Sequence, residues 1–404
     1  MSPNTPLAIT KIKKLDNSFK MTTLKLNKQT RSLQAGFTLL ELMIAISLGL
    51  IIVAAATMLF LTSQKSYVLQ NGMADLQDSA NFGLNAIAKD IRLTNLNSTT
   101  AQITDETTYG GIVLTSSVNA TKKPAVAATP TTPAIAEVVL SNLYKTISGD
   151  SAVENVLSRS HGMTAGTTPA WTGASNAKTT AGTNLLSDQL TIQFVPQYIL
   201  DDKGTSTTAD DDWVGGYDCE GQELRFAVED QGDNRAFGRQ MIVQRYFLRT
   251  DANAGNEPNQ PLALACESGF YALTETGVSR IQGGAPSQVL NTDTFGKSSG
   301  QIIMKRVDHF RVLLGTQNSD GYRYRSIKEY MDIVAGARPR ILSIQLAALV
   351  RSNQSVSGDV ISNDQEFKIL DQVVKIKEPA ANTPKYVRDV VSQTIALRNT
   401  FGDR

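Results

Sequence analysis

The chain has 404 residues, of which 19% are charged and 41% hydrophobic, with 39 Lys and Arg against 38 Asp and Glu. This composition is typical of a water-soluble globular domain and excludes a protein that crosses a membrane many times. Seven basic residues and one acid precede residue 37, so the remaining 368 residues have a formal net charge of −5, which excludes a nucleic-acid-binding surface spread over the whole domain.

The first feature in chain order is a basic segment, residues 1–36, followed by an apolar run. Its charged residues are Asp16 and the basic residues Lys11, Lys13, Lys14, Lys20, Lys25, Lys28 and Arg31. The apolar run from Leu42 to Leu61 contains no charge, and as a helix it would span about 30 Å, the thickness of a bilayer core. Positive charge beside the first apolar segment keeps that side cytoplasmic, so we expect the rest of the chain on the other side of the membrane.

The junction between these segments reads Gly36-Phe37-Thr38-Leu39-Leu40-Glu41. It resembles the class III signal of type IV pilins. The resemblance implies that a prepilin peptidase cuts after Gly36, that the new N-terminal Phe37 is methylated, and that residues 1–36 are a leader peptide. A start at Met21 would leave a shorter basic leader and fits the same signal. A secretory signal peptide differs because its cleavage site follows the apolar core.

Glu41 is a lone carboxylate at the edge of the apolar run, where a charge is costly and needs a partner. The same resemblance implies that it pairs with the amine of Phe37 in a neighbouring subunit of a filament. The cut creates that cation next to the apolar segment, and a buried carboxylate needs an opposite charge. The alternative is a glutamate that rests at the lipid headgroup boundary.

Residues 62–96 continue the helix as an amphipathic half. Apolar residues recur there at steps of three and four, as expected of one helical face; they are Leu69, Met73, Leu76, Ala80, Leu84, Ile87 and Ile91. We predict one helix of about 55 residues, with 37–61 in the membrane or a filament core and 62–96 against a globular head. Its glycines, Gly49, Gly72 and Gly83, mark bends or close contacts, or occur there by chance.

After residue 96 the pattern changes to short apolar runs between turn-rich stretches, which predicts antiparallel strands. The predicted strands are 111–115, 138–144, 189–194, 223–228, 241–250, 261–266, 270–274, 310–314, 341–351, 367–374 and, from its β-branched content, 386–398. A short helix is predicted at 330–335. The expected fold is α+β and pilin-like, a long N-terminal helix packed on an enlarged antiparallel β-sheet head (97–404) with inserted surface loops at 116–135, 158–183 and 200–216.

The two cysteines, Cys219 and Cys266, predict one disulfide if the head is outside the cytoplasm. Closing a loop of this length stabilises a fold by roughly 4 kcal/mol in the chain-entropy model. The alternative is two unrelated buried thiols. The pair forms no CxxC motif, so the sequence does not predict a zinc or redox site.

Catalytic and metal sites have little support in the sequence. The two histidines are His161 and His309, and Asp308 and His309 are neighbours on a predicted strand, where adjacent side chains point to opposite faces. We therefore expect no enzyme and no cofactor. The carboxylates of Asp201–Asp202 and Asp210–Asp212 do not match the spacing of a calcium loop, and we expect a solvated acidic loop.

Segments of the helix and of the second half resemble the PilW family of minor pilins. These segments are Ser66–Gln70, Ala86–Arg92, Val307–Gly315, Asp320–Tyr322, Ile341–Arg351 and Thr394–Asn399. The resemblance implies a minor pilin that joins other minor pilins and the major pilin, primes assembly of a type IV pilus and sits at its tip. Residues 97–300 carry no recognisable motif beyond the cysteine pair.

The partners that the resemblance implies are a prepilin peptidase, inner-membrane lipid, the pilus assembly platform and other pilins, with no specific nucleic acid. The protein would span the inner membrane once, with a periplasmic head, before it enters the pilus. Two alternatives remain: a type II secretion pseudopilin, and a membrane-tethered adhesin or binding protein that never enters a filament.

Overall fold

The computed structural model describes much of the chain from residue 36 onward. The described ranges are 36–98, 100–116, 121–123, 125–134, 136–143, 156–166, 171–230, 236–253, 257, 259–272, 282–283, 295–296, 299–319, 321–356, 361–362, 364–378 and 383–400. The expected leader before Gly36 and the Asp320 position of the expected turn lie outside the described residues.

The chain divides into two compact units, residues 1–60 and residues 61–404. Helix α1 (Leu39–Ile91, 53 residues) begins in the first and ends in the second. In the first unit, the described residues are apolar turns of α1 that are exposed on every side. The predicted single long helix is confirmed.

In the second unit, the remaining turns of α1 bury the predicted apolar face. Leu76, Ala80, Leu84, Ile87 and Ile91 are buried, whereas Leu69 and Met73 are half-buried. The buried positions are spaced by four, four, three and four residues, so they form one stripe of a 3.6-residue period.

The largest sheet of the head is six-stranded, with the order β1-β5-β9-β10-β11 and β12 paired to β10. Its strands are β1 (Gly111–Ile112), β5 (Leu190–Phe194), β9 (Gln240–Thr250), β10 (Leu262–Ala272), β11 (Gln282–Gly283) and β12 (Gln301–Lys305). Strands 261–266 and 270–274, predicted separately, form the single strand β10, because Gly269 keeps its place in the ladder opposite Val243.

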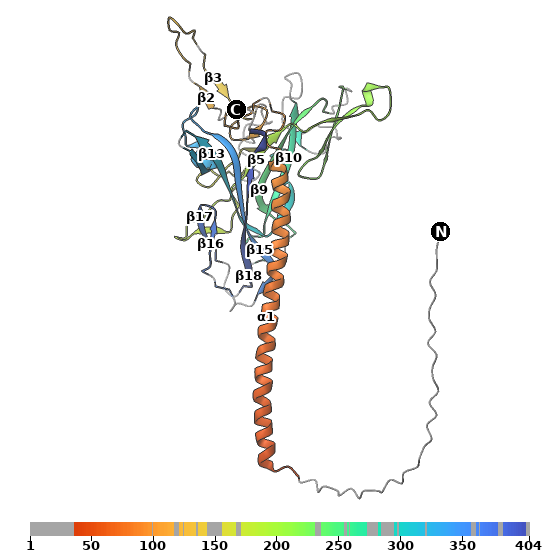
Figure 1. Ribbon diagram of the computed structural model, residues 1–404, viewed down its shortest axis with the longest axis vertical. Helices are drawn as coiled ribbons and strands as arrows, with labels where there is room; N and C mark the ends of the chain where they lie inside the picture. Colours follow the sequence, from red (N-terminus) through yellow and green to blue (C-terminus); the bar gives the residue numbers. More distant parts are fainter. Residues whose placement is uncertain are drawn as a thin grey trace, which may run out of the picture. The chain divides into compact units, whose positions relative to one another are not determined.

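The second sheet has four antiparallel strands in the order β14-β13-β15-β18. Three of them, β13, β15 and β18, are labelled in Figure 1. They are β13 (Val307–Asn318), β14 (Gly321–Ser326), β15 (Arg340–Val356) and β18 (Lys385–Ala396). Helix α3 (Ile327–Met331) follows β14 and starts with a capping box between Ser326 and Glu329. The sequence placed this helix three residues too late, at 330–335, because the serine–glutamate cap was not recognised.

Three small sheets complete the described strands. The first has the order β16-β17-β4, with β4 (Ala177–Thr179), β16 (Glu366–Ile369) and β17 (Gln372–Ile376). The second pairs β2 (Thr121–Lys123) with β3 (Val138–Leu140). The third has the order β6-β7-β8, with β6 (Ile199–Asp201), β7 (Asp212–Tyr217) and β8 (Glu223–Ala227). Two short 3₁₀ turns, η2 (Thr208–Asp210) and η3 (Arg398–Thr400), are also present.

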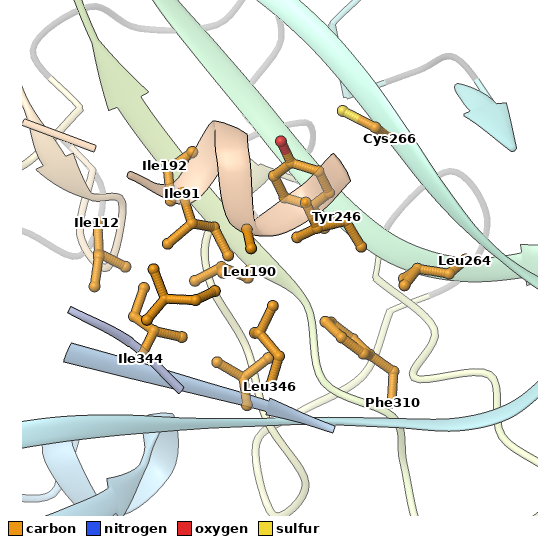
Figure 2. Close-up of a cluster of buried hydrophobic side chains, with 14 of the residues drawn as sticks. Ile91, Ile112, Leu190, Ile192, Tyr246, Leu264, Cys266, Phe310, Ile344 and Leu346 are labelled. Atoms are coloured by element: carbon orange, nitrogen blue, oxygen red, sulfur yellow. The ribbon is translucent and has the colours of Figure 1, made fainter. Parts of the chain in front are cut away.

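The two large sheets and α1 share one hydrophobic core. Figure 2 shows Ile91 of α1 together with Leu190 and Tyr246 of the six-stranded sheet and Ile344 and Leu346 of the four-stranded sheet. The head is therefore built around the last turns of α1.

The opposite face of the four-stranded sheet is covered as well. Ala347 and Leu349 of β15 pack against Ala177 of β4, Phe367 of β16 and Val374 of β17. Because both faces are covered, β13 is buried along almost its whole length. Two expectations differ here: the predicted strand 367–374 is the hairpin β16–β17, and the stretch 158–183, expected as a surface loop, supplies β4 and the buried Trp171.

The other two expected loops also contain strands. In 116–135, strand β2 pairs with β3, and the exposed turn beyond it includes the bridge between Thr129 and Thr132. The stretch 200–216 contains part of the β6–β7 hairpin with η2 at its turn.

A pair of asparagines joins the end of α1 to η3. The Asn399 side-chain amide donates to the carbonyl oxygens of Arg92 (3.2 Å) and Thr94 (3.0 Å). In return, the Asn95 amide donates to the carbonyl oxygen of Asn399 (3.1 Å) and to that of Thr100 (2.8 Å). These bonds satisfy carbonyl groups that a helix end leaves without partners.

Two of the α1 glycines lie against strands. An added Cβ at Gly83 would stand 2.7 Å from Cε and 3.0 Å from Cβ of Met304, whereas one at Gly72 would meet Cβ of Ser352 at 3.4 Å. Gly49 has nothing within 4 Å. Gly83 therefore marks a close contact, while Gly72 leaves room for a methyl group.

We predict that Gly83→Val destabilises the full-length protein by about 1–3 kcal/mol, because the larger side chain must displace Met304. Gly72→Ala serves as the matched control and should be neutral or stabilising by up to about 1 kcal/mol through helix propensity. Denaturant unfolding in detergent measures both; equal destabilisation by the two substitutions would contradict the assigned contact.

Candidate functional site

The candidate site is the N-terminal part of α1, where the expected processing and assembly residues lie. The structure places Gly36 and Phe37 before the first turn and Glu41 in that turn. Phe37 is 87% exposed.

Glu41 takes part in a capping box with Thr38. The Thr38 backbone N–H and hydroxyl both donate to Oε2 of Glu41 at 3.1 Å, and the Glu41 N–H donates to the Thr38 hydroxyl at 3.3 Å. This reciprocal arrangement satisfies N–H groups that the start of a helix leaves without partners. A carboxylate in the first turn is also stabilised by the helix dipole.

The sequence analysis did not predict the capping role of Thr38. The pattern Thr-x-x-Glu before an apolar run is the sequence signature of a capping box. The box holds the Glu41 carboxylate at the N–H of Thr38, one residue after the bond between Gly36 and Phe37. Cleavage of that bond would leave the new amine on the residue directly before Thr38.

The apolar turns after Glu41 expose large side chains on all faces. Among the most exposed are Ile52, Met58 and Leu59. Among the described residues, one helix, Leu39–Ile91, is long and apolar enough to cross a membrane. A helix that is apolar all round needs an apolar environment, either lipid or a bundle of similar helices.

Two segments of the chain match known family models. Residues 31–57 match the prokaryotic N-terminal methylation motif, and residues 278–399 match the family described as type IV pilus-assembly protein W, PilW. The chain carries a PilW domain.

No curated protein matches the chain. Among solved structures, the type IV-like pilin TTHA1219 from Thermus thermophilus is similar at 11% identity, with a TM-score of 0.21, over 53% of this chain and 78% of that chain.

These matches agree with the resemblance drawn from the sequence. The PilW domain includes the four-stranded sheet, and its β13, β15 and β18 contain the segments Val307–Gly315, Ile341–Arg351 and Thr394–Ala396 that pointed to this family. The two matches support a type IV pilus minor pilin and indicate a structural pilin rather than an enzyme. They imply processing by a prepilin peptidase and partners within a pilus, and the motif with the single apolar helix fits a membrane-anchored pilin.

The predicted disulfide is present, outside the PilW domain. Cys219, in the turn between β7 and β8, is bonded to Cys266 of β10, with their Cα atoms 6.1 Å apart. The bond fastens the small β6-β7-β8 sheet to the six-stranded sheet.

Both histidines form hydrogen bonds within the head. His309 is buried, and its Nδ1 lies 2.9 Å from the Ser175 hydroxyl and 3.2 Å from the Ser187 hydroxyl. Burial and the neighbouring Arg311 lower the pKa of His309 to about 3, so the ring is neutral at physiological pH. The strand has a register shift between Val307 and His309, so the strict alternation expected for Asp308 and His309 does not hold there. The Asp308 carboxylate accepts from Asn176 at 2.8 Å and from Arg388 at 2.7 Å. His161 accepts from the Leu186 N–H at 3.1 Å.

Two of the acidic residues near 201–212, Asp201 and Asp212, form ion pairs with basic side chains. Arg225 lies 2.6 Å from Asp201 and 3.2 Å from Asp212, and Lys203 lies 2.9 Å from Asp212. Within the part of the chain that the structure describes, no group of three His, Cys, Asp or Glu side chains is placed to hold a metal ion.

A cluster of carboxylates lies beside the disulfide, between the end of α1 and the two joined sheets. Glu267 is buried and paired with Arg245. Glu220 accepts from the Ser268 N–H at 2.9 Å. Burial, with help from the charges of Asp218 and Glu267, raises the pKa of Glu220 to about 7. Burial also raises the pKa of Asp218 and of Asp90.

Glu220 therefore binds its proton more tightly in the folded chain than in the unfolded chain. Its contribution to the free energy of unfolding grows as the pH falls from above 7 toward the unfolded-state pKa of about 4.3. We predict that Glu220→Gln, which keeps a hydrogen-bond acceptor but removes the charge, raises the melting temperature at pH 8 and has less effect at pH 5.

The matched control is Glu137→Gln, at an exposed position in the head. Melting temperatures between pH 5 and pH 8 should separate the two variants. Because His309 is buried and neutral, the folded protein loses stability as the pH falls below the pKa of this histidine in the unfolded chain. This loss is the same in all variants. A Glu220→Gln curve parallel to the wild-type curve would contradict the assignment.

Proposed function

We propose that this chain is a minor pilin that is cut after Gly36, methylated on Phe37 and inserted once in the inner membrane with its head in the periplasm. From there it joins other minor pilins in a complex that primes assembly of the type IV pilus and sits at its tip. The observation that carries the proposal is an apolar helix that begins at Leu39, within the methylation motif, and is exposed through its apolar first half, in a chain that also has a PilW domain.

The mechanism is packing rather than chemistry. Lipid is as apolar as a bundle of helices, so burial alone gives no preference for the filament. Close packing of side chains and pairing of Glu41 with the methylated amine of a neighbouring Phe37 would supply that preference. The capping box supports this role because it orders the carboxylate at the point where the amine is created.

A type II secretion pseudopilin would share the helix. The match of residues 278–399 to a pilus-assembly family favours the pilus. A membrane-tethered adhesin would not need the methylation motif.

The first experiment is a mass measurement of the mature N-terminus purified from the native membrane. We expect a chain that starts at Phe37 with one added methyl group. A chain that still starts at Met1 or Met21 would overturn the proposal, as would an unchanged size after the prepilin peptidase is removed, because a simple tethered protein keeps its full length.

The second experiment separates the two roles of Glu41. Glutamine at this position keeps the capping hydrogen bonds but cannot form an ion pair. We predict that Glu41→Gln and Glu41→Ala are both cut normally and that both lower the amount of the protein in sheared pili by about tenfold or more, as expected for loss of a buried ion pair.

The matched control is Thr38→Ser, which preserves the cap and should assemble normally. If Glu41→Gln assembles as well as the wild type and only Glu41→Ala fails, the cap and not the ion pair is what assembly requires.

A further inference from the structure

The outer face of the four-stranded sheet, which the β16-β17-β4 sheet covers near Ala347 and Leu349, is exposed near the start of β14. Residues that are paired across antiparallel strands share one face of a sheet. Three successive rows of paired residues therefore lie side by side on this face. We call their exposed and half-buried side chains the outer-face patch; they are Tyr322, Tyr324, Gln317, Arg340, Gln345 and Thr394.

The side chain of Tyr322 lies across this patch in a fixed orientation. Its hydroxyl is hydrogen-bonded to the Ser343 hydroxyl of β15, so the side chain crosses the intervening strand β13. The crossing requires the glycine at position 315, because a Cβ there would stand 2.9 Å from Cζ of Tyr322. The ring of Tyr324 meets that of Tyr322 edge to face, with the ring centroids 5.2 Å apart. Tyr322 is still 49% exposed, so part of an ordered aromatic ring is open to a ligand.

Polar side chains surround the ring. Gln317 lies opposite Tyr322 on β13, and Arg340 of β15 lies opposite Gln317. The Arg340 guanidinium donates to Oε1 of Gln317 at 2.6 Å. In the third row, the Gln345 amide donates to the Thr394 hydroxyl at 3.2 Å. The patch therefore combines an aromatic ring with amide, hydroxyl and guanidinium groups.

The charge of the patch is positive. Its three rows contain no Asp or Glu. Within the residues that the structure describes, neither Arg340 nor the exposed Arg323 of β14 forms an ion pair. In the row that follows, by contrast, Arg311 is paired with Asp188 and Asp371. Because a guanidinium group binds a carboxylate through two parallel hydrogen bonds, the charge of the patch points to an occupant that carries carboxylates.

We infer that the outer-face patch binds an acidic polysaccharide in which neutral sugars separate the carboxylates. The C–H face of one sugar ring would lie on Tyr322, because the face of an aromatic ring is negative and attracts polarised C–H groups. A neighbouring sugar carboxylate would bind Arg340, and the Gln317 and Gln345 amides would bind sugar hydroxyls. This inference goes beyond the proposed function and does not depend on entry into a pilus.

Single-stranded nucleic acid is the other polyanion that stacks on aromatic rings. It carries a charge on every nucleotide, and its affinity comes mainly from many contacts between phosphates and Lys or Arg. The chain after residue 36 has a formal net charge of −5, and Arg340 is the only basic side chain of the patch. A polysaccharide with separated carboxylates fits one guanidinium beside amides and hydroxyls better than a nucleic acid does.

The test measures binding of three probes of equal length to the full-length protein in detergent by titration calorimetry. The first probe is a hyaluronan oligosaccharide, in which carboxylate-bearing and neutral sugars alternate. The second is the same oligosaccharide with its carboxylates reduced to alcohols, and the third is an oligothymidine. We expect the hyaluronan oligosaccharide to bind about tenfold or more tightly than either of the others, as expected for a hydrogen bond to a charged group.

Substitutions then assign the contacts. Tyr322→Ala should lower the affinity for the hyaluronan oligosaccharide by about tenfold, the size of effect typical of an aromatic anchor. Tyr322→Phe removes the hydrogen bond to Ser343 but retains the ring, so it should bind as the wild type does. Arg340→Gln should bind the acidic and the reduced oligosaccharide with equal affinity. The matched control is Tyr217→Ala, which removes a tyrosine that is 72% exposed on β7 of a different sheet and should leave the affinity unchanged.

Several results would overturn the inference. They are no binding of the hyaluronan oligosaccharide by the folded wild type, equal binding of its reduced form, tighter binding of oligothymidine, and an equal loss of affinity in Tyr217→Ala and Tyr322→Ala. Melting temperatures show whether each variant is folded, and if Tyr322→Ala is not, the specificity of Arg340→Gln decides. Entry into sheared pili is scored separately and should be normal in all variants, so this inference and the proposed function can fail independently.

Discussion

Burial of one face of α1 between two β-sheets is the interaction on which the head depends. The stripe from Leu76 to Ile91 contributes to the same core as the inner faces of the six-stranded and four-stranded sheets. Without the helix, both sheets would expose their apolar inner faces to water, so the sheets and the helix end form one cooperative core. In the described residues of the first unit, the apolar turns of the same helix are exposed, so one continuous element can serve two environments.

Buried ion pairs add specificity to this core. Arg245 is paired with Glu267 between β9 and β10, and Arg311 of β13 is paired with Asp188, just before β5. Removing one partner of such a pair typically costs 3–5 kcal/mol, because the remaining charge stays buried, although the intact pair adds little net stability. Each pair joins different segments, so it favours one register of the strands over others.

The sequence predicted the features that depend on periodicity and the ones that depend on a motif. The α1 stripe, most of the strands of the two large sheets, the disulfide and the PilW character followed from residue patterns. The β16–β17 hairpin did not, because its turn is made by Leu370, which has a positive φ of 53°, and Leu gives no turn signal. The stretch 158–183 was misread because small polar residues such as Ser158 and Asn176 are buried through hydrogen bonds rather than through apolar area. The charge of Glu41 predicts an ion pair, whereas its spacing to Thr38 predicts the cap, which the sequence analysis did not include.

The asparagine pair that joins the end of α1 to η3 has a consequence for how the protein is made. Asn95 is synthesised about three hundred positions before Asn399, yet its amide donates to the Asn399 carbonyl oxygen, and the Asn399 amide donates to the carbonyl oxygen of Thr94. A nascent head must therefore wait for almost the whole polypeptide before these hydrogen bonds at the helix end can form. During that interval the last turns of α1 and the inner faces of both sheets are exposed to solvent, and a chaperone that binds exposed apolar segments would find its substrate there.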